Sequence, residues 1–338
     1  MENISLYRKY RPAKFGEIIG QDHVVDVLQA AIKNKKVSHS YIFSGGRGTG
    51  KTSLARLFAE ALMVGKDDIL EMDAASNRGI DDIRALRDGV RVLPFSSPYK
   101  IYIIDEAHML TNEAWNALLK TIEEPPKHVI FIFATTEIGK FPDTIISRCE
   151  VYKFKNPSVS DLEKLVTTVA KKEDLNLDKG VAELVANLGG GSFRDTLSTL
   201  QKLISYSSDK KISLEEAEKI TGAPSSLVVR DILTSFVKGD EQSLVEKIES
   251  LRSGEVDFTK LALLLVKQLR VMLVLGAGAK DVDFVYSEIS KEDFEYIKSL
   301  IKDGHKISPQ QLSQAIESYE NEKITNFPGV PLLVSLVK

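Results

Sequence analysis

The sequence predicts an α/β domain with a parallel β-sheet, followed by helical domains. Short apolar runs alternate with amphipathic helical stretches up to about residue 155, as in parallel strands joined by crossover helices. The runs 101–104 and 129–134 are continuously apolar, which is typical of strands buried on both faces of a sheet. After Pro157 only helical signals remain. These three observations define the fold class.

Two boundaries follow from the same pattern. The first is the change of pattern at Pro157, and the second is the break Thr221-Gly222-Ala223-Pro224. Between them, Ser160–Glu163 and Ser213–Glu216 have the spacing of helix-capping boxes. A chain of 338 residues is long enough for two or three domains. We therefore predict an α/β domain over residues 1–156, a small helical domain over 157–222 and an all-helical domain over 223–338.

Composition narrows the class of protein. The net charge of −3 gives no global basic field, so any contact with nucleic acid must come from a local patch. The single cysteine, Cys149, excludes an internal disulfide or a multi-cysteine metal site, and in its apolar context it reads as a small core residue. No apolar run reaches membrane-spanning length, including the apolar-rich stretch 261–275, and residues 1–3 do not begin a signal peptide. We expect a cytoplasmic protein without a membrane partner.

The strongest motif is a glycine-rich loop between a strand and a helix. Tyr41-Ile42-Phe43 reads as a short strand, residues 45–52 match G-x-x-x-x-G-K-T, and residues 53–59 continue as an amphipathic helix. This context predicts a nucleoside triphosphate site, because the loop N–H groups and the helix N-terminus point at the phosphates. Lys51 would neutralise phosphate oxygens, and the Thr52 hydroxyl would bind Mg²⁺. The predicted nucleotide-binding residues here are Gly45, Gly46, Arg47, Gly48, Thr49, Gly50, Lys51, Thr52 and Ser53.

Two acidic residues follow the apolar run 101–104. Ligands of parallel sheets bind at the carboxyl ends of the strands, where Asp105 and Glu106 would lie. Asp105 would hold the Mg²⁺ sphere, and Glu106 would orient and polarise the attacking water. The interval 107–126 reads as a helix from His108, stopped by the prolines at its end.

Several other positions allow two interpretations from the residues alone. Residues 6–12, which are rich in aromatic and basic side chains, can be interpreted either as a solvated segment or as a segment that contacts the adenine base. Thr136, at the end of a strand, caps a turn or senses the γ-phosphate. Arg148 is a solvated loop residue or a functional one, and the glycines before Arg194 are a flexible turn or position this arginine at a helix start.

Taken together, the motifs resemble one family. These are Tyr10-Arg11-Pro12, the loop 45–52, Asp73-Ala74-Ala75-Ser76-Asn77-Arg78-Gly79-Ile80-Asp81, Ile104–Leu110, Asn116–Pro126, Ala134-Thr135-Thr136 and Ser147-Arg148-Cys149. They are closely similar to the gamma/tau subunits of the bacterial DNA polymerase III clamp loader, which are AAA+ ATPases. The specific motifs cover about residues 4–222, and the last third matches in helical character and length.

The resemblance implies a role and a set of residues. It implies an ATP- and Mg²⁺-dependent motor that opens a sliding clamp and loads it onto primer–template DNA, in a hetero-pentameric ring with delta- and delta-prime-type subunits. Any polymerase activity would belong to the holoenzyme. The first domain would bind the nucleotide, the second would be a lid and the third a collar that joins the subunits. The implied residues are Tyr7, Arg8, Arg11, Pro12, Ile18 and Ile19 around adenine, Thr136 as sensor 1, Arg194 as sensor 2, Arg148 as an arginine finger acting in trans, and Arg84, Thr111, Lys140 and Thr144 at DNA.

One departure from the family concerns zinc. Most members carry a four-cysteine zinc module between the P-loop helix and the Asp-Ala-Ala-Ser turn, whereas residues 62–70 here contain no cysteine. We therefore expect no zinc. Two alternatives stay open, namely a non-hydrolysing structural subunit of such a ring and another AAA+ DNA motor. The intact Lys51, Thr52, Asp105 and Glu106 count against the first, and the Asp-Ala-Ala-Ser-Asn-Arg-Gly turn counts against the second.

Overall fold

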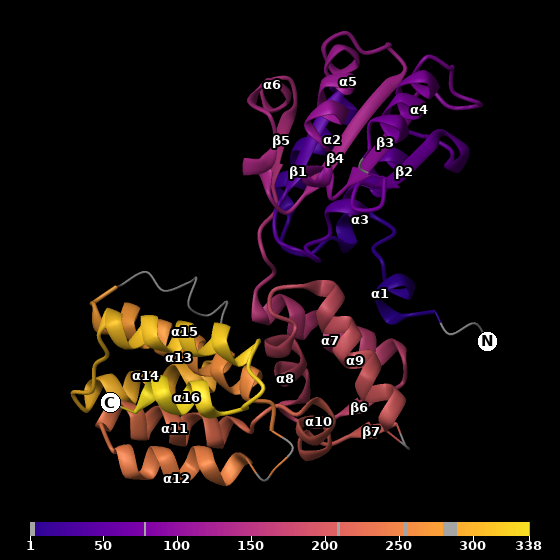
Figure 1. The fold of residues 1–338 in the computed structure, drawn as a ribbon. Coiled ribbons are helices and arrows are strands. Elements are labelled where there is room, and N and C mark those ends of the chain that lie inside the picture. Colours follow the sequence, from indigo (N-terminus) through magenta and orange to yellow (C-terminus); the bar gives the residue numbers. More distant parts are fainter. Residues whose placement is uncertain are drawn as a thin grey trace. The chain divides into compact units, whose positions relative to one another are not determined.

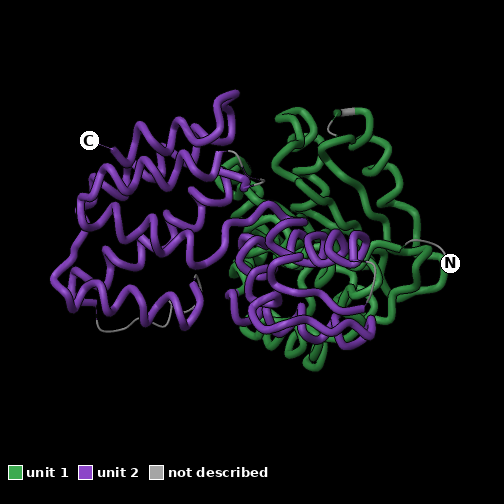
Figure 2. Tube along the Cα trace, turned by 90° about the horizontal axis from the view of Figure 1, so that it is seen from below, with its two compact units in different colours: residues 1–157, 191–194 green, residues 158–190, 195–338 purple. Residues whose placement is uncertain are grey.

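The computed structural model describes residues 4–77, 79–207, 210–252, 254, 256–279 and 289–337, so Arg78 of the Asp73–Asp81 motif lies outside the described residues. The chain forms two compact units (Figure 2). Unit 1 comprises residues 1–157 and 191–194, and unit 2 comprises 158–190 and 195–338. The further division of the helical part near residue 222 stays a prediction.

Unit 1 contains, within the described residues, a five-stranded parallel sheet in the order β2-β3-β4-β1-β5. Non-consecutive strands are neighbours because each crossover passes over a face of the sheet. The central strands are continuously buried, as their apolar runs predict. The strands are β1 (Ser40–Ser44), β2 (Ile69–Asp73), β3 (Lys100–Asp105), β4 (Val129–Thr135) and β5 (Glu150–Lys153).

Helices cover both faces of this sheet (Figure 1). Alternate strand residues point to opposite faces. Tyr41 and Phe43 pack against α2 and α3, whereas Ile42 between them packs in the core formed with α4, α5 and α6. Cys149 is half-buried against this second core, and burial raises the pKa of its thiol to about 12. The helices of unit 1 are α1 (Leu6–Lys9), α2 (Asp22–Lys33), α3 (Lys51–Ala61), α4 (Ile80–Val90), α5 (Asn112–Glu123) and α6 (Asp143–Ile146).

Short 3₁₀ turns connect several of these elements, and one of them corrects the sequence prediction. The helix expected from His108 begins only at Asn112, because the Thr111 side chain accepts a hydrogen bond from the Ala114 N–H and so caps the helix there. His108 instead lies in a 3₁₀ turn next to β3. The 3₁₀ turns are η1 (Phe15–Glu17), η2 (Lys66–Asp68), η3 (Ala107–Met109) and η4 (Ile138–Lys140).

Unit 2 is mostly helical, but the expectation of helices only after Pro157 is wrong in one detail. Two-residue strands, β6 (Asn176–Leu177) and β7 (Lys211–Ile212), pair in parallel. Such short strands have too few residues to show a period-2 pattern. The helices before residue 222 are α7 (Val159–Lys172), α8 (Val181–Leu188), α9 (Phe193–Tyr206), whose first two residues belong to unit 1, and α10 (Leu214–Thr221).

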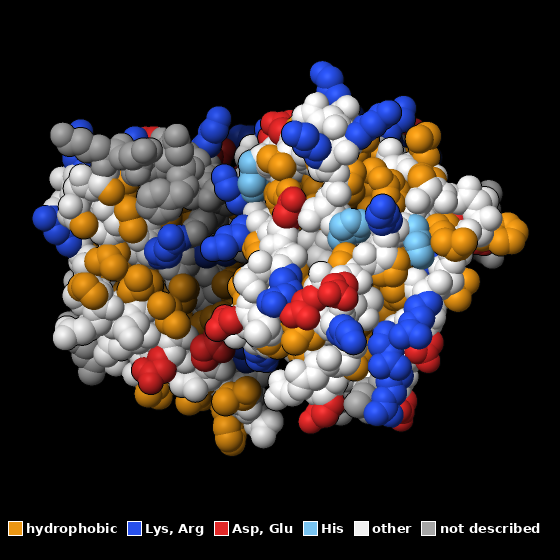
Figure 3. All heavy atoms as spheres, turned by 90° about the horizontal axis from the view of Figure 1, so that it is seen from above, with side chains coloured by type: hydrophobic (Ala, Val, Ile, Leu, Met, Phe, Trp, Pro, Cys, Tyr) orange, Lys and Arg blue, Asp and Glu red, His pale blue; other side chains and the backbone are white. Residues whose placement is uncertain are grey.

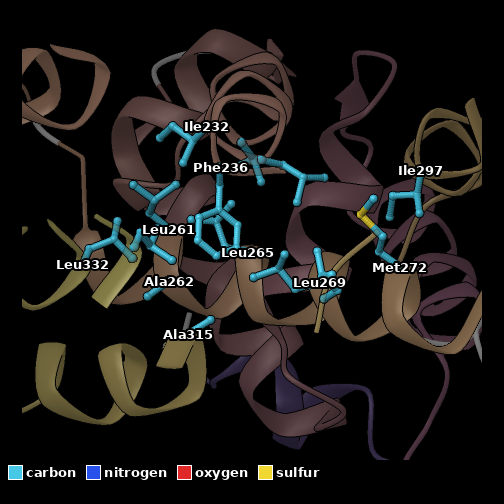
Figure 4. Packing of buried hydrophobic residues seen from close by; sticks show 14 of the residues in the cluster. Ile232, Phe236, Leu261, Ala262, Leu265, Leu269, Met272, Ile297, Ala315 and Leu332 are labelled. Atoms are coloured by element: carbon cyan, nitrogen blue, oxygen red, sulfur yellow. The ribbon is translucent and has the colours of Figure 1, made fainter. Parts of the chain in front are cut away.

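The remaining helices pack around α13 (Phe258–Gly276). Leu261, Leu265, Leu269 and Met272 recur on one face of α13 and enter a common apolar core with neighbouring helices (Figure 4). The apolar-rich stretch 261–275 is therefore core, and no helix in the described residues has the length and apolarity needed to cross a membrane. The helices around α13 are α11 (Ser226–Lys238), α12 (Glu241–Arg252), α14 (Lys291–Lys302), α15 (Pro309–Glu322) and α16 (Val330–Leu336).

Candidate nucleotide-binding site

The glycine-rich loop lies at the carboxyl end of β1, a strand in the interior of the sheet. Gly48 and Gly50 have φ values of 70° and 97°, in the left-handed region that favours glycine. A Cβ on Gly48 would also lie 2.0 Å from Ser192 Oγ. The buried Thr49 hydroxyl donates to the Gly46 carbonyl at 2.9 Å. Arg47 is exposed, and Ser53 is half-buried in the first turn of α3.

Lys51 is 6% exposed, and its ammonium group faces back into the loop. Nζ donates to the carbonyls of Gly45 at 2.8 Å and Gly46 at 2.7 Å. Desolvation lowers the pKa of Lys51, and the charges of Glu106 and Asp105 act in the opposite direction. A cation held in a partly dry loop beside these backbone groups is suited to a polyphosphate.

Thr52 and Asp105, the two predicted magnesium ligands, are in contact. The Thr52 hydroxyl donates to Asp105 Oδ2 at 2.7 Å, which joins the start of α3 to the end of β3. Hydroxyl and carboxylate oxygens are hard donors of the kind that Mg²⁺ takes, with phosphate and water completing the sphere. Among the described residues there is no group of three or more His, Cys, Asp or Glu side chains that could hold a metal ion. The pair therefore fits Mg²⁺ bound together with a nucleotide.

Glu106 follows Asp105 with φ 47° and ψ 41°, a left-handed conformation that is uncommon for a non-glycine residue. Its N–H donates to Asp105 Oδ1 at 3.0 Å. The Thr136 hydroxyl, beyond the end of β4, lies 3.5 Å from Glu106 Oε2. The structure thus brings the predicted base and the predicted sensor 1 together at the carboxyl ends of β3 and β4.

The N-terminal residues predicted to surround adenine lie near Arg194 and in the core. The Arg194 guanidinium lies over the Tyr7 ring, 5.0 Å from its centroid. Hydrogen bonds from Ser5, Arg194 and Arg8 lower the pKa of Tyr7 to about 8. Desolvation and the charge of Arg56 lower the pKa of the half-buried Arg11. Ile18 packs against the core beneath α2 and α3, and Pro12 and Ile19 are half-buried.

Curated proteins similar to this chain are described as tau, gamma/tau or gamma subunits of DNA polymerase III. "DNA polymerase III subunit tau" of Bacillus subtilis is 37% identical, over 99% of this chain and 62% of that protein. "DNA polymerase III subunit gamma/tau" of Mycobacterium tuberculosis is 38% identical, over 80% of this chain and 51% of that protein. "DNA polymerase III subunit gamma" of Buchnera aphidicola is 30% identical, over 87% of this chain and 83% of that protein.

The chain belongs to the DNA polymerase III gamma/tau family. A family model described as "DNA polymerase III, delta subunit" also matches residues 20–79 and 67–158 of this gamma/tau-family chain. The chain spans about three fifths of the length of the Bacillus subtilis relative and about half of that of the Mycobacterium tuberculosis relative.

Solved structures of a more distant protein show the fold. "Thermotoga maritima RuvB Holliday junction branch migration motor" is 21% identical, with a TM-score of 0.54 over 87% of this chain and 91% of that one. At this identity the likeness concerns the fold alone. It confirms for the gamma/tau-family chain an AAA+ architecture with a parallel sheet and a helical C-terminal part.

Arg148 and the loop of its own chain lie at opposite ends of two neighbouring parallel strands, β5 and β1. Arg148 precedes β5, whose first residue Glu150 pairs with Tyr41 in β1, whereas the loop follows Ser44 at the other end of β1. Arg148 Nη2 pairs with Glu123 Oε1 at 2.8 Å, and Nη1 donates to the Thr144 carbonyl at 2.7 Å. The structure does not bring Arg148 to its own nucleotide site.

The four predicted DNA residues are dispersed over several elements. Arg84 pairs with Asp81 at 3.1 Å within α4, and Lys140 pairs with Glu137 at 2.9 Å. Thr111 caps α5, and Thr144 lies inside α6, a single turn rather than an extended helix. On the face drawn in Figure 3, Lys and Arg side chains occur in separate groups with Asp and Glu among them. A DNA role for these four stays a prediction.

Sequence reasoning missed two residues. His108 is read from the sequence as part of a helix, but its side chain contacts Glu106, Thr135 and Glu137. The buried Gln21 donates from Nε2 to the Lys155 carbonyl at 2.7 Å and accepts from the Lys155 N–H at 3.0 Å. The sequence offers one signal for a role of His108 near the site, namely its position two residues after Glu106, the predicted base.

Proposed function

We propose that this chain is the ATP-hydrolysing subunit of a clamp loader, which opens a sliding clamp and loads it onto primer–template DNA. The observation that carries the proposal is the convergence of Lys51, Thr52, Asp105, Glu106 and Thr136 at the carboxyl ends of β1, β3 and β4. Membership of the gamma/tau family supports the same role. The intact set favours a hydrolysing subunit over a structural one.

Each residue would have a distinct task in hydrolysis. Lys51 would exchange the carbonyls of Gly45 and Gly46 for phosphate oxygens. Thr52 and Asp105 would hold Mg²⁺, which supplies neutralising charge to the phosphates. Glu106 would orient and polarise the attacking water, and Thr136 would sense the γ-phosphate beside it. Arg194 would reach the γ-phosphate from the start of α9, and the segment containing Tyr7, Arg8, Arg11, Pro12, Ile18 and Ile19 would border adenine.

The site would be completed by a neighbouring subunit. Because Arg148 lies at the amino end of β5, away from the loop at the carboxyl end of β1, its guanidinium would contact the phosphates of an adjacent subunit in a hetero-pentameric ring with delta- and delta-prime-type subunits. The helices from α11 onward would form the collar of that ring. We expect ATP and Mg²⁺ as the only cofactors, without zinc.

Contact with DNA would be local and independent of sequence. Arg84 and Lys140 would exchange their exposed partners, Asp81 and Glu137, for phosphates, and the amides near Thr111 and Thr144 would add hydrogen bonds. Such binding weakens as salt rises, because it releases counterions. Neutralising Arg84 and Lys140 together should lower the DNA affinity of the assembled ring and reduce its salt dependence, and an unchanged affinity would remove both from the interface.

Two substitutions test the nucleotide site. Lys51→Ala should weaken ATP binding by about 100-fold or more, because a desolvated charge opposite the phosphates is lost. Glu106→Gln should retain binding but lower turnover by about 10²- to 10⁴-fold, because an amide is a poor base. Equilibrium titration with a fluorescent ATP analogue and steady-state hydrolysis in the assembled complex measure the two effects. Unchanged ATP affinity of Lys51→Ala would contradict the loop assignment, and normal turnover by Glu106→Gln would contradict the role of that residue.

A further inference from the structure

We propose that His108 is a positioning residue that holds the Glu106 carboxylate in the orientation needed for hydrolysis. The proposal rests on the proposed function, since it assigns to His108 an effect on the base of that reaction. His108 contacts neither nucleotide nor water in this scheme. It acts through Glu106.

The imidazole lies between three side chains from two strand ends. Nδ1 lies 3.0 Å from Thr135 Oγ1 and 3.5 Å from Glu106 Oε2, and Nε2 lies 3.4 Å from Glu137 Oε1. The His108 side chain is 8% exposed, so water competes little for these contacts. Each ring nitrogen therefore has its own oxygen partners.

Thr135 contacts the same ring nitrogen as Glu106 and holds it in place. It is fully buried at the end of β4, and its hydroxyl oxygen also accepts the Glu137 N–H at 3.0 Å. Glu137 in turn pairs with Lys140 at 2.9 Å. The ring is thus tied to the sheet through Thr135 and to the following turn through Glu137, which leaves it little rotational freedom.

Glu106 is the residue that requires such support. Its left-handed backbone places the side chain beside β4, where it is about one third exposed. The contacts from His108 and Thr136 both fall on Oε2. They would set the plane of the carboxylate through one oxygen and direct the other, Oε1, toward water. The rate of a reaction falls steeply when a catalytic group is displaced, so the orientation of the Glu106 carboxylate should affect the rate of hydrolysis.

The two nitrogens of His108 can be tested separately. In His108→Asn, the amide occupies the place of Nδ1 and retains a donor for Glu106 and Thr135. In His108→Gln, the longer side chain reaches the place of Nε2 and retains only the contact to Glu137. The assay is steady-state ATP hydrolysis by the chain assembled with delta- and delta-prime-type subunits of its own source, together with equilibrium ATP binding.

His108→Ala and His108→Gln should lose about 10- to 100-fold in kcat with ATP affinity unchanged, as expected when a catalytic carboxylate loses the neighbour that orients it. His108→Asn should recover most of that loss. A merely structural role would lower the unfolding temperature of both conservative variants without separating their kcat values. Rescue by Gln rather than Asn, or kcat values equal to wild type in all three variants, would overturn the proposal. Should His108→Ala fail to fold, the Asn and Gln pair decides alone.

A double-mutant cycle separates this inference from the proposed function. If His108 acts through Glu106, then His108→Ala should cause no further loss of kcat in a Glu106→Gln background. A full additional loss there would show that His108 acts elsewhere and would overturn the inference. Wild-type turnover by Glu106→Gln itself would instead overturn the assignment of the base, and this proposal with it.

Discussion

Lys51 is buried in the described structure, with two of its three ammonium hydrogens engaged by the carbonyls of Gly45 and Gly46. Replacing these two hydrogen bonds by bonds to phosphate oxygens changes the partners without exposing the charge to water. The net gain on nucleotide binding would then come from opposite charge, because charged partners form stronger hydrogen bonds than carbonyls. The Lys51 ammonium group could therefore exchange its partners for phosphate oxygens without a movement of the lysine backbone.

Two glycines of this loop should respond differently to alanine. Both Gly48→Ala and Gly50→Ala force a side chain into the left-handed region, which costs about 1–2 kcal/mol. Only Gly48→Ala also places a Cβ against Ser192 Oγ, since nothing lies within 4 Å of a Cβ on Gly50. Gly48→Ala should therefore lower the unfolding temperature and the ATP affinity more than its matched control Gly50→Ala. Thermal unfolding and ATP titration measure this difference, and an equal loss in both variants would show that the contact with Ser192 does not matter.

At the scale of elements, Asp68 connects the 3₁₀ turn η2 to the segment before β3. Its carboxylate accepts the N–H groups of Phe95 at 2.6 Å and of Ser96 and Ser97 at 3.1 Å each. Desolvation acts to raise the pKa of Asp68, but the hydrogen bonds from Phe95, Ser97 and Ser96 together lower it. This segment therefore has a fixed backbone although the Phe95 side chain is 85% exposed.

The lowered pKa of Asp68 predicts a pH dependence. A carboxyl whose pKa is depressed by folding contributes stability above its unfolded pKa and loses it as the pH falls through the folded value. Asp68→Asn should cost about 1–3 kcal/mol at pH 7, because the charge-assisted hydrogen bonds weaken. The difference in unfolding temperature between wild type and variant should shrink as the pH falls below the unfolded pKa of Asp68 and toward its lowered folded pKa, because the wild-type carboxylate then becomes protonated and neutral like the amide. A difference that stays constant over this range would exclude Asp68 as its source.

The sequence predicts those elements whose signal is local. The strand, loop and helix around Lys51 follow one another within 22 residues (40–61), so apolar pattern and glycine spacing are enough to predict them. The contact of His108 with Thr135 joins residues 27 positions apart, and it depends on β3 and β4 being neighbours in the sheet. Two-residue strands such as β6 and β7 are set by tertiary pairing, which no local pattern encodes.

At the scale of the whole molecule, the positions of the loop and Arg148 predict hydrolysis that depends on assembly. The isolated chain should be a poor ATPase. Arg148→Ala should retain nucleotide binding but lose turnover in the complex. Mixing Arg148→Ala chains with Lys51→Ala chains should restore part of the activity, because an intact loop then meets an intact arginine across one interface. Steady-state ATP hydrolysis at fixed total protein measures both the loss in Arg148→Ala and the recovery on mixing. Full activity of an unassembled monomer that is lost in Arg148→Ala would show that the arginine acts in cis.

The opposite placement of these two features along β1 and β5 has a numerical consequence. If Arg148 of one chain completes the nucleotide site of the next, such chains would associate head to tail through heterologous interfaces. In an open row of such chains, the first has an arginine without a site and the last has a site without an arginine. The number of complete sites is then one fewer than the number of chains, unless a different subunit occupies the end of the row. A non-identical subunit that supplies an arginine to the last chain would therefore add one complete ATPase site to the row, and one that lacks the arginine would not.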